Sequence, residues 1–588
     1  MAMKTDTYGN IHKSGQVKRI VVGIAILCVA LNFGAFAQTL PDAGQIQREI
    51  ERDRVPGVAP RPLTAPGIEE PVRPALTAPE AARFLVKGFR ISRAVAFPEA
   101  ELLPLLKDFV GKELSLADLQ RAADTITRYY REHGYFVARA YIPAQDIKDG
   151  IVEIIVIEGK VERISVNPVG DVRLKDVVVK KTLSSALPAD GLIREANLER
   201  SLLLLNDLPG IDVRSTLSPG AAVGASLLTA DVKEGPLVSG NVDFDNYGNK
   251  FSGEYRLSTT LNLNDPSGHG DLLFLRAMVS SASGIRYGRF GYQLPVGTSG
   301  LKVGAAFADM DYELSGEFSA LDAHGDAKIA SLNGLYPLIR GRNLNIYTTA
   351  TYDDKRFFNS TIAGTTSNKR IHVATLGING DSMDFKGGGG VNTFSLTFFT
   401  GSLNLDGWAP DRAADDATVR TDGQYTKVTY SLARLQKLVG PTSLYAEFSG
   451  QLASKNLDSS EKFTLGGPQG VRAYPQGEAA GDEGMLLNLE LRYEVSQSLQ
   501  LAAFVDHGKI RLHRDKWIDW QGNNTRIDNR YELSGYGLGL RWSMPGNFLV
   551  LAGVAQRMGD NPGRDIHGND SDNASHHTRL WLQGVKYF

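Results

Sequence analysis

The stretch MLLNLELRY, residues 485–493, is the clearest indication of how this 588-residue chain folds. Successive side chains of a β-strand point to opposite faces, so an extended stretch divides into two sets. One face carries Leu487, Leu489, Leu491 and Tyr493, and the other carries Leu486, Asn488, Glu490 and Arg492. A strand with one apolar face and one mixed face fits a sheet whose two sides meet different surroundings.

The same alternation continues along the chain after Gly235, where helical periodicity ends. We count sixteen alternating segments, which begin near residues 237, 253, 270, 284, 301, 325, 343, 370, 390, 423, 442, 484, 499, 530, 548 and 578. No apolar run beyond residue 40 reaches the roughly 20 residues of a membrane helix. The strands of a soluble β-sandwich also alternate between apolar and polar residues. The number and the spacing of the segments must therefore distinguish a sandwich from a barrel.

The connections favour a transmembrane antiparallel β-barrel of about sixteen strands over residues 236–588. Tight turns are expected between segments 2–3, 6–7, 10–11, 12–13 and 14–15. Long polar loops are expected between segments 7–8, 9–10, 11–12, 13–14 and 15–16. An even strand number with long loops on one side and short turns on the other is typical of outer-membrane barrels. Both ends of the barrel then lie on the periplasmic side, and the strand ending at Phe588 closes on the first strand.

Two modules precede the barrel, and each mixes strands with helices. Residues 82–160 predict a strand at 84–91, a helix after Pro98, a second helix over 115–134 and two further strands. Residues 161–235 repeat the order more faintly, with helices at about 173–186 and 194–206. Two consecutive units with one order indicate a tandem array of α+β modules.

The first 80 residues divide into three parts. Residues 1–37 predict a signal peptide, with Lys13, Lys18 and Arg19 before the apolar run 20–31 and a small-residue site at 35–37; an uncleaved anchor is the alternative. Residues 42–54 predict a short charged helix. Residues 55–80 predict a proline-rich linker, because seven prolines in the 24 residues 56–79 exclude a packed element. A disordered tail remains the alternative to a placed helix.

Composition excludes several function classes. The net charge of -2 argues against a nucleic-acid partner. The only cysteine, Cys28, lies in the expected signal peptide, so no thiolate metal site is expected. KGGGGV (386–391) opens a strand rather than a helix and indicates a turn, not a phosphate loop. The loop 565–577 mixes Asp, Asn and His, but a solvated loop is favoured over a cation site. We expect no enzyme, no cofactor and no metal.

The loop LGGPQGVRAYPQGEAAGDEG, residues 465–484, joins segments 11 and 12 on the long-loop side. Its six glycines permit a tight fold, and Tyr474 is too apolar for an exposed tip. One way to satisfy Arg472 is to turn the loop into the lumen, where Asp506 is a possible partner. Phe504 and Gly508 share a strand face with Asp506, and Gly508 leaves room for an approaching loop. A solvated surface loop remains the alternative.

Three motifs resemble the two-partner secretion transporters of the outer-membrane assembly-factor superfamily. They are VRAYP within GGPQGVRAYP, FVDHG (504–508), and the upstream run GYFVARAYIPAQDIKDGIVEIIVIEG, and the resemblance covers nearly the whole chain. It implies two polypeptide-transport-associated (POTRA) modules at 82–160 and 161–235. It also implies a helix at 42–54 that plugs the pore and a linker that lets the helix withdraw.

The resemblance also assigns candidate functional residues. The loop motif is Val471, Arg472, Ala473, Tyr474 and Pro475, and its partners in the lumen are Phe504, Asp506 and Gly508. Ala473 departs from the glycine more usual in that family. The candidate docking residues of the first module are Tyr135, Val137, Arg139, Tyr141 and Pro143. Phe588 resembles the signal read by the barrel-assembly machinery, although Lys586 is less apolar than usual at its position.

The function that the resemblance implies is secretion. The modules would capture one unfolded exoprotein (an adhesin, a haemolysin or a contact toxin), which would cross the outer membrane without nucleotide. Other implied partners are outer-membrane lipid and the barrel-assembly machinery. An assembly factor for other barrels is the second candidate, but such factors usually carry more modules and lack the plug helix. A passive porin is the third, and it has no reason for two docking modules.

Overall fold

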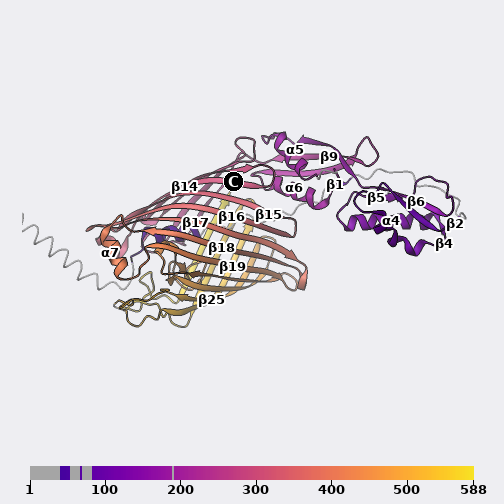
Figure 1. Cartoon of the computed structure of the whole chain (residues 1–588). Coiled ribbons are helices and arrows are strands. Elements are labelled where there is room, and N and C mark those ends of the chain that lie inside the picture. The colour runs from indigo at the N-terminus through magenta and orange to yellow at the C-terminus, as the bar shows by residue number, and fades with distance from the viewer. Residues whose placement is uncertain (1–39, 53–66, 69–82, 188–190, 523) are drawn as a thin grey trace, which may run out of the picture.

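The computed structural model describes residues 40–52, 67–68, 83–187, 191–522 and 524–588. The expected signal peptide and most of the expected linker lie outside the described residues. Figure 1 shows two small modules in a row beside a large barrel. Among the described residues, no helix is both long and apolar enough to cross a bilayer.

The first module packs helices against short strands around its own core. Its elements are β2 (Arg83–Val86), β3 (Gly88–Ser92), α3 (Glu99–Leu102), the 3-10 helix η2 (Leu103–Phe109), β4 (Lys112–Ser115), α4 (Leu116–Glu132), β5 (Arg139–Tyr141) and β6 (Ile151–Ile157). The predicted single strand at 84–91 is therefore wrong. It divides at Lys87, because β2 pairs with β4 whereas β3 pairs with β6. The sheet order β3-β6-β5 leaves β5 at an edge.

Helix α4 begins and ends where its sequence requires. The Ser115 hydroxyl accepts a hydrogen bond from the Asp118 amide at 3.2 Å. The Asp118 carboxylate in turn accepts one from the Ser115 amide at 2.9 Å. These two bonds form a capping box. Gly134 follows the helix at a φ of +84°, which stops it.

The second module repeats the arrangement and carries one strand that we did not expect. Its elements are β7 (Lys160–Pro168), α5 (Asp176–Ser185), α6 (Glu195–Asn206), β8 (Ile211–Pro219) and β9 (Ala225–Glu234), with β1 (Gly67–Ile68) added. β1 pairs in parallel with Thr216 and Leu217 of β8 at the edge of the sheet. The prediction that no packed element survives in the linker is wrong at these two residues. Neither of them is a proline, so both keep the backbone donors that a strand needs.

Sixteen antiparallel strands close into one barrel, which confirms the predicted fold class. They are β10 (Val238–Asp245), β11 (Arg256–Asn264), β12 (Leu272–Ser280), β13 (Ile285–Val296), β14 (Leu301–Glu313), β15 (His324–Arg340), β16 (Leu344–Thr361), β17 (Gly364–Asp384), β18 (Gly390–Asn404), β19 (Gly423–Lys437), β20 (Thr442–Ala453), β23 (Glu483–Glu494), β24 (Leu499–Arg511), β25 (Arg530–Met544), β26 (Phe548–Met558) and β27 (Thr578–Tyr587). At the seam, β10 pairs with β27. Gly240 and Phe588 exchange two backbone hydrogen bonds there, of 2.9 and 3.1 Å.

The expected long loop between the seventh and eighth strands is absent. Only Ile362 and Ala363 separate β16 from β17, which run for 18 and 21 residues. Strands of that length exceed the roughly 10 residues that a barrel strand needs to span a membrane. The polar segment 364–369 belongs to β17, beyond the bilayer, where both faces of the sheet meet polar surroundings. Composition alone therefore gave the wrong answer at this connection.

Short elements occupy the loops and the lumen. They are α2 (Ala43–Arg52), the two-residue strands β21 (Phe463–Thr464) and β22 (Ala480–Gly481), helix α7 (Ala409–Ala417), and the 3-10 helices η3 (Ser281–Ser283), η4 (Gly316–Leu321), η5 (Lys386–Gly388) and η6 (Ser459–Glu461). The α2 helix lies within the predicted segment 42–54. In Figure 1 it is drawn inside the barrel, in indigo.

The second module is attached to the short-turn end of the barrel. Asp207, which follows α6, accepts two hydrogen bonds from the Arg340 guanidinium, at 2.8 and 2.7 Å. The Asp207 carbonyl also accepts one from the Lys302 ammonium at 2.7 Å. Arg200 donates to the Pro337 carbonyl at 2.7 Å. These bonds fix the second module on the side that we assign to the periplasm.

Candidate functional site

The loop 465–484 folds into the barrel rather than out into solvent. The side chains of Leu465, Val471, Ala473 and Tyr474 are fully buried. They join a cluster with inward-facing residues of the barrel wall, including Leu486, Phe504, Leu533 and Ala555. Burial of this apolar set gives the loop a hydrophobic reason to enter the lumen.

Arg472 and Asp506 meet in a bidentate ion pair. The Arg472 Nε and Nη2 atoms lie 2.9 and 2.7 Å from the two carboxylate oxygens of Asp506. The Arg472 backbone N–H donates to the same carboxylate at 3.0 Å. Asp506 is fully buried, so the pair stands in a water-poor place where charge-assisted bonds are strong. Burial lowers the pKa of Arg472, but Asp506 outweighs burial and the pKa lies above its usual value.

Three further residues hold Arg472 in place, and none of them was predicted from the sequence to be its partner. The Arg472 Nη1 atom donates to Glu490 at 2.6 Å. Asn488 donates to Asp506 at 2.7 Å. The Trp581 indole donates to the Arg472 carbonyl at 2.7 Å. Alternation placed Asn488 and Glu490 on one face of their strand, and the structure shows that this face is the inward one.

The predicted neighbours of the loop surround it closely. The Arg472 guanidinium lies 3.5 Å from the centre of the Phe504 ring. A Cβ atom on Gly508 would lie 2.5 Å from a methyl carbon of Leu465, and one on Gly535 would lie 2.5 Å from the Ala473 Cβ. Ala473, which departs from the family motif, therefore fits because Gly535 stands opposite. Pro475 is also buried.

Gly508→Val is expected to push the loop off its seat. A side chain there overlaps Leu465, and overpacking of this kind typically costs about 1–3 kcal/mol. The measurement is protease cleavage of the loop in whole cells, where the variant should be cut faster than the parent protein. Gly546→Val is the matched control, because a Cβ there meets open space at the short turn 545–547, although its φ of +69° adds local strain. Equal cleavage of the two variants would contradict the prediction.

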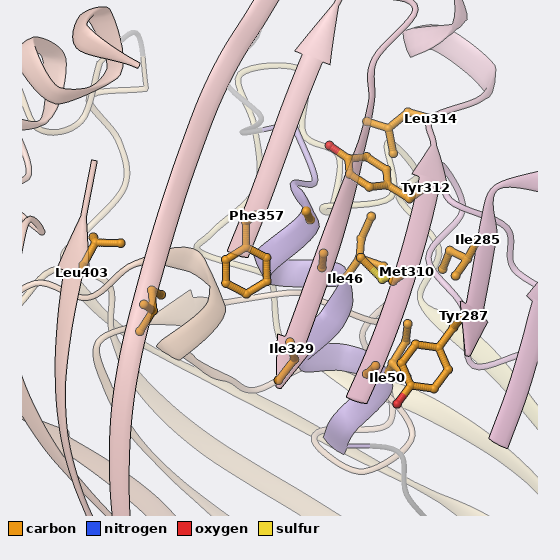
Figure 2. Close-up of a cluster of buried hydrophobic side chains, with 14 of the residues drawn as sticks. Ile46, Ile50, Ile285, Tyr287, Met310, Tyr312, Leu314, Ile329, Phe357 and Leu403 are labelled. Atoms are coloured by element: carbon orange, nitrogen blue, oxygen red, sulfur yellow. The ribbon is translucent and has the colours of Figure 1, made fainter. Parts of the chain in front are cut away.

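The α2 helix packs one apolar face against the inner wall of the barrel. Ala43, Ile46 and Ile50 are buried there. Figure 2 shows Ile46 and Ile50 facing Met310, Tyr312, Ile329 and Phe357, which project from neighbouring strands. Ten residues of helix thus lie inside the lumen.

The other side of α2 is held by charges. The Lys369 ammonium lies 3.0 Å from Asp42 and 2.7 Å from Asp458. Ser459 donates to Asp42 at 2.7 Å, and Asp42 accepts the Gln45 amide at 2.8 Å as the helix begins. Arg48 donates to the Ser459 carbonyl. These contacts tie the helix to the segment 458–461.

The helix also touches the loop that carries Arg472. Arg52 donates to the carbonyls of Thr464 at 3.0 Å and Gln469 at 2.8 Å. A Cβ on Gly477 would lie 2.7 Å from a carboxylate oxygen of Glu49. The two elements that sequence reasoning treated separately therefore share an interface inside the barrel.

Glu461 anchors the segment that holds α2. Its carboxylate lies 2.9 Å from Lys355 and 2.8 Å from Lys427, both on the inner wall. Burial alone raises the pKa of Glu461, but the two ammonium groups outweigh burial and lower the pKa to about 2. The carboxylate is therefore charged at any physiological pH.

The candidate docking residues of the first module separate into two groups. Tyr135 is only 7% exposed and packs in the module core, so its ring is not available to a partner. Arg139 is exposed on edge strand β5, and Tyr141 and Pro143 are partly exposed. Val137 and Arg139 line a cavity of about 260 Å³ between the two modules, opposite the turn 217–226 of the second module.

The remaining predicted positions are the C-terminal aromatic and the mixed loop. Phe588 extends the last strand, and its side chain is half-exposed. In the loop 565–577, Asp570 accepts from Asn561 at 2.9 Å and pairs with Arg557, and Asp572 pairs with Arg579 at 2.7 Å. Over the described part of the chain, no group of three or more His, Cys, Asp or Glu side chains is arranged to hold a metal.

Comparison with known proteins gives consistent family matches. Residues 224–542 match the haemolysin secretion/activation proteins ShlB/FhaC/HecB, and residues 84–159 match the ShlB-type POTRA domain. The heme/hemopexin transporter protein HuxB of Haemophilus influenzae is 30% identical over 83% of this chain and 84% of its own length. The outer membrane transporter CdiB of Escherichia coli O6:K15:H31 is 26% identical over 81% of this chain and 80% of its own.

Solved structures show the same fold. CdiB from Escherichia coli superposes with a TM-score of 0.68 and 21% identity, covering 88% of this chain and 93% of that one. CdiB from Acinetobacter baumannii gives a TM-score of 0.62 and 16% identity, covering 94% of this chain and all of that one.

Proposed function

This chain belongs to the haemolysin secretion/activation protein family ShlB/FhaC/HecB, and from that premise we propose which groups carry out its work as a two-partner secretion transporter of the outer membrane. An unfolded exoprotein binds the periplasmic POTRA modules and leaves through the barrel. The protein is a pore and not an enzyme. One observation carries the proposal: α2 and the inward loop touch each other inside the lumen, on the path that an exported chain would take.

Passage requires that the lumen be cleared. The α2 helix occupies the space that a translocating chain would use, so we infer that it acts as a plug and withdraws toward the linker. The loop 465–484 stays attached through Arg472 and Asp506 and keeps the wall in shape while the helix leaves. Folding of the exported portion outside the cell biases its motion outward, and no nucleotide is needed.

The exoprotein is proposed to dock where a module leaves the edge of its sheet unpaired. Strand β5 is an edge strand whose backbone can pair with an extended chain, a mode that tolerates many sequences. The cavity beside it accepts an apolar side chain, and Arg139 attracts a carboxylate. In the second module, β1 already covers the β8 edge, so a chain that docks there must displace the linker.

Arg139→Glu is expected to weaken capture of the exoprotein without disturbing the barrel. The side chain is exposed on an edge strand, so the reversal leaves the module core intact while it repels acidic segments. The measurement is the affinity of the full-length transporter in detergent for the N-terminal secretion domain of its partner. Arg121→Glu, on the exposed side of α4, is the matched control. Equal loss in both variants would contradict a specific role for Arg139.

The partner proteins are proposed by class. The exoprotein is an adhesin, a haemolysin or a contact toxin, or a protein that acts in haem acquisition, as the name of the HuxB relatives suggests. The barrel-assembly machinery inserts the chain by reading the strand that ends at Phe588.

The test compares the outer-membrane and medium proteomes of cells with and without this protein. The proposal expects one large protein to disappear from the surface and the medium while other barrels stay at normal levels. The identity of that protein gives the exported partner. A joint fall of many barrel proteins would instead make the chain an assembly factor and overturn the proposal.

A further inference from the structure

The outer wall of the barrel carries three cations in one row. Lys328 of β15 lies directly opposite Arg356 of β16, and Arg356 lies directly opposite Arg370 of β17. Their side chains are 51%, 62% and 44% exposed. Like charges in direct cross-strand register destabilise a sheet unless something compensates them.

Carboxylates compensate this row unevenly. Asp354 accepts two hydrogen bonds from Arg370, at 2.8 and 2.5 Å, and lies 3.7 Å from Arg356. One carboxylate therefore serves two guanidinium groups. Asp326 lies 3.6 Å from Lys328, and Asp309 stands opposite Lys328 on β14. Asp326 and Asp309 balance Lys328, so an uncompensated positive charge remains only over β16 and β17, where Arg356 and Arg370 share Asp354 and the side chain of Arg356 is the most exposed of the three cations.

An apolar groove lies below the row, on the same strands and toward the periplasmic turns. It has a volume of about 840 Å³. Its lining includes the small residues Ala305, Gly334, Ala350 and Ala374. Gly334 and Ala350 are direct cross-strand partners, and a Cβ on Gly334 would meet open space. The lining also includes larger side chains: Val303, Leu332, Tyr352, Leu376 and Phe398.

The row stands at the height of lipid head groups. Below Lys328, the outward positions of β15 are Ala330, Leu332, Gly334, Tyr336 and Leu338. Ten residues separate Lys328 from Leu338, or about 33 Å along a strand. At a tilt of about 40° this becomes roughly 25 Å along the membrane normal, the height of the apolar band of such barrels. β15 starts at its extracellular end, so the cations face the outer leaflet. In Figure 1, β14 to β18 lie side by side on this wall.

We propose that the wall formed by β14–β18 is a binding site for a phosphorylated, multi-acyl lipid of the outer leaflet. The acyl chains lie in the groove over Gly334 and Ala350, and a phosphate bridges Arg356 and Arg370. Arginine forks match phosphate oxygens in geometry and charge, which explains why two of them are tolerated in register. The bound lipid relieves the repulsion within the row and fills a hollow that small residues leave open.

The chain offers a matched pair of controls on another strand. Ala350 and Arg356 are six residues apart on the outward face of β16. Ala503 and Lys509 are likewise six residues apart on the outward face of β24, and Lys509 is 2.8 Å from Glu532. Ala350→Phe fills the groove and Arg356→Gln/Arg370→Gln removes the anion contacts. Away from the proposed site, Ala503→Phe adds the same bulk, and Lys509→Gln neutralises one outward cation where the arginine variant neutralises two.

The experiment titrates the full-length protein in detergent with diphosphorylated hexa-acyl lipid A and reads binding by native mass spectrometry. Ala350→Phe and the double arginine variant are each expected to bind about tenfold more weakly, and the two β24 controls to change by less than about twofold. The same lipid without its phosphates should bind the parent protein as weakly as the arginine variant binds lipid A.

Three results would overturn the proposal. The first is equal affinity in all variants, and the second is equal affinity for the lipid with and without phosphate. The third is an altered oligomeric state of Ala350→Phe with unchanged lipid affinity, because that result would place a second copy of the chain on this wall.

Discussion

Arg472→Ala is expected to reduce secretion of the exoprotein more than any other single substitution in this chain. The change removes the cation that lies between Asp506 and Glu490, which are 0% and 14% exposed. Removing one partner of a buried pair costs about 3–5 kcal/mol, because the remaining charge stays buried and uncompensated. The loop would leave its seat, and the contacts of Arg52 with Thr464 and Gln469 would go with it.

Two measurements test this prediction together. The amount of exoprotein in the medium reports secretion, and the gel mobility of the unheated protein reports whether the barrel is folded. A folded barrel that no longer secretes is the expected result. Arg492→Ala is the matched control, because Arg492 also pairs with Glu490, at 2.7 Å, and stacks over Tyr445. In the described part of the chain, no hydrogen bond or ion pair joins Arg492 to the loop. Normal secretion by Arg472→Ala with the loop protected from protease would show that the ion pair is dispensable.

The charge swap Arg472→Asp/Asp506→Arg is expected not to restore secretion. Asp506 accepts the backbone N–H of Arg472 and the Asn488 side chain as well as the guanidinium. An arginine at 506 has no acceptor for either donor. Rescue by the swap would mean that net charge alone seats the loop.

The alternation of apolar and polar side chains located the strands well, because one face of each strand meets apolar lipid and the other meets the polar lumen. Fifteen of the sixteen expected starting points lie within three residues of the observed ones, and the exception is β17, which begins at Gly364 rather than near 370. That strand leaves the bilayer, so its outer part lacks the apolar face on which the pattern depends. Helix α7, in a polar loop, carries no such signal either.

The site was accessible from the sequence only where residues share a strand face. Asn488 and Glu490 stood on the inward face of one segment and Asp506 on that of its neighbour, so a charged pocket between them could have been inferred. The contact of Arg52 with the loop had no comparable signal, because 412 residues separate Arg52 from Thr464 in the chain. Such a contact follows from the closed barrel and not from any local pattern.

Locking α2 in place is expected to stop secretion reversibly. A Cβ on Gly44 would lie 2.9 Å from the Ser460 Cβ, and a shift of less than about 1 Å brings the two into the 3.5–4.5 Å range of a disulfide. Cys28 is the chain's only cysteine, and it lies in the expected signal peptide, so Gly44→Cys/Ser460→Cys introduces one defined pair.

The oxidised double variant should insert normally and secrete at background level, and a reductant should restore secretion. Each single variant is a control for the effect of the substitution itself. This experiment separates two roles of the helix that its contacts alone do not distinguish. If α2 only completes the packing of the lumen, a covalent bond to the segment 458–461 reinforces what Lys369 and Arg48 already do, and secretion continues. If the helix must leave, the bond blocks the route however well the barrel is folded.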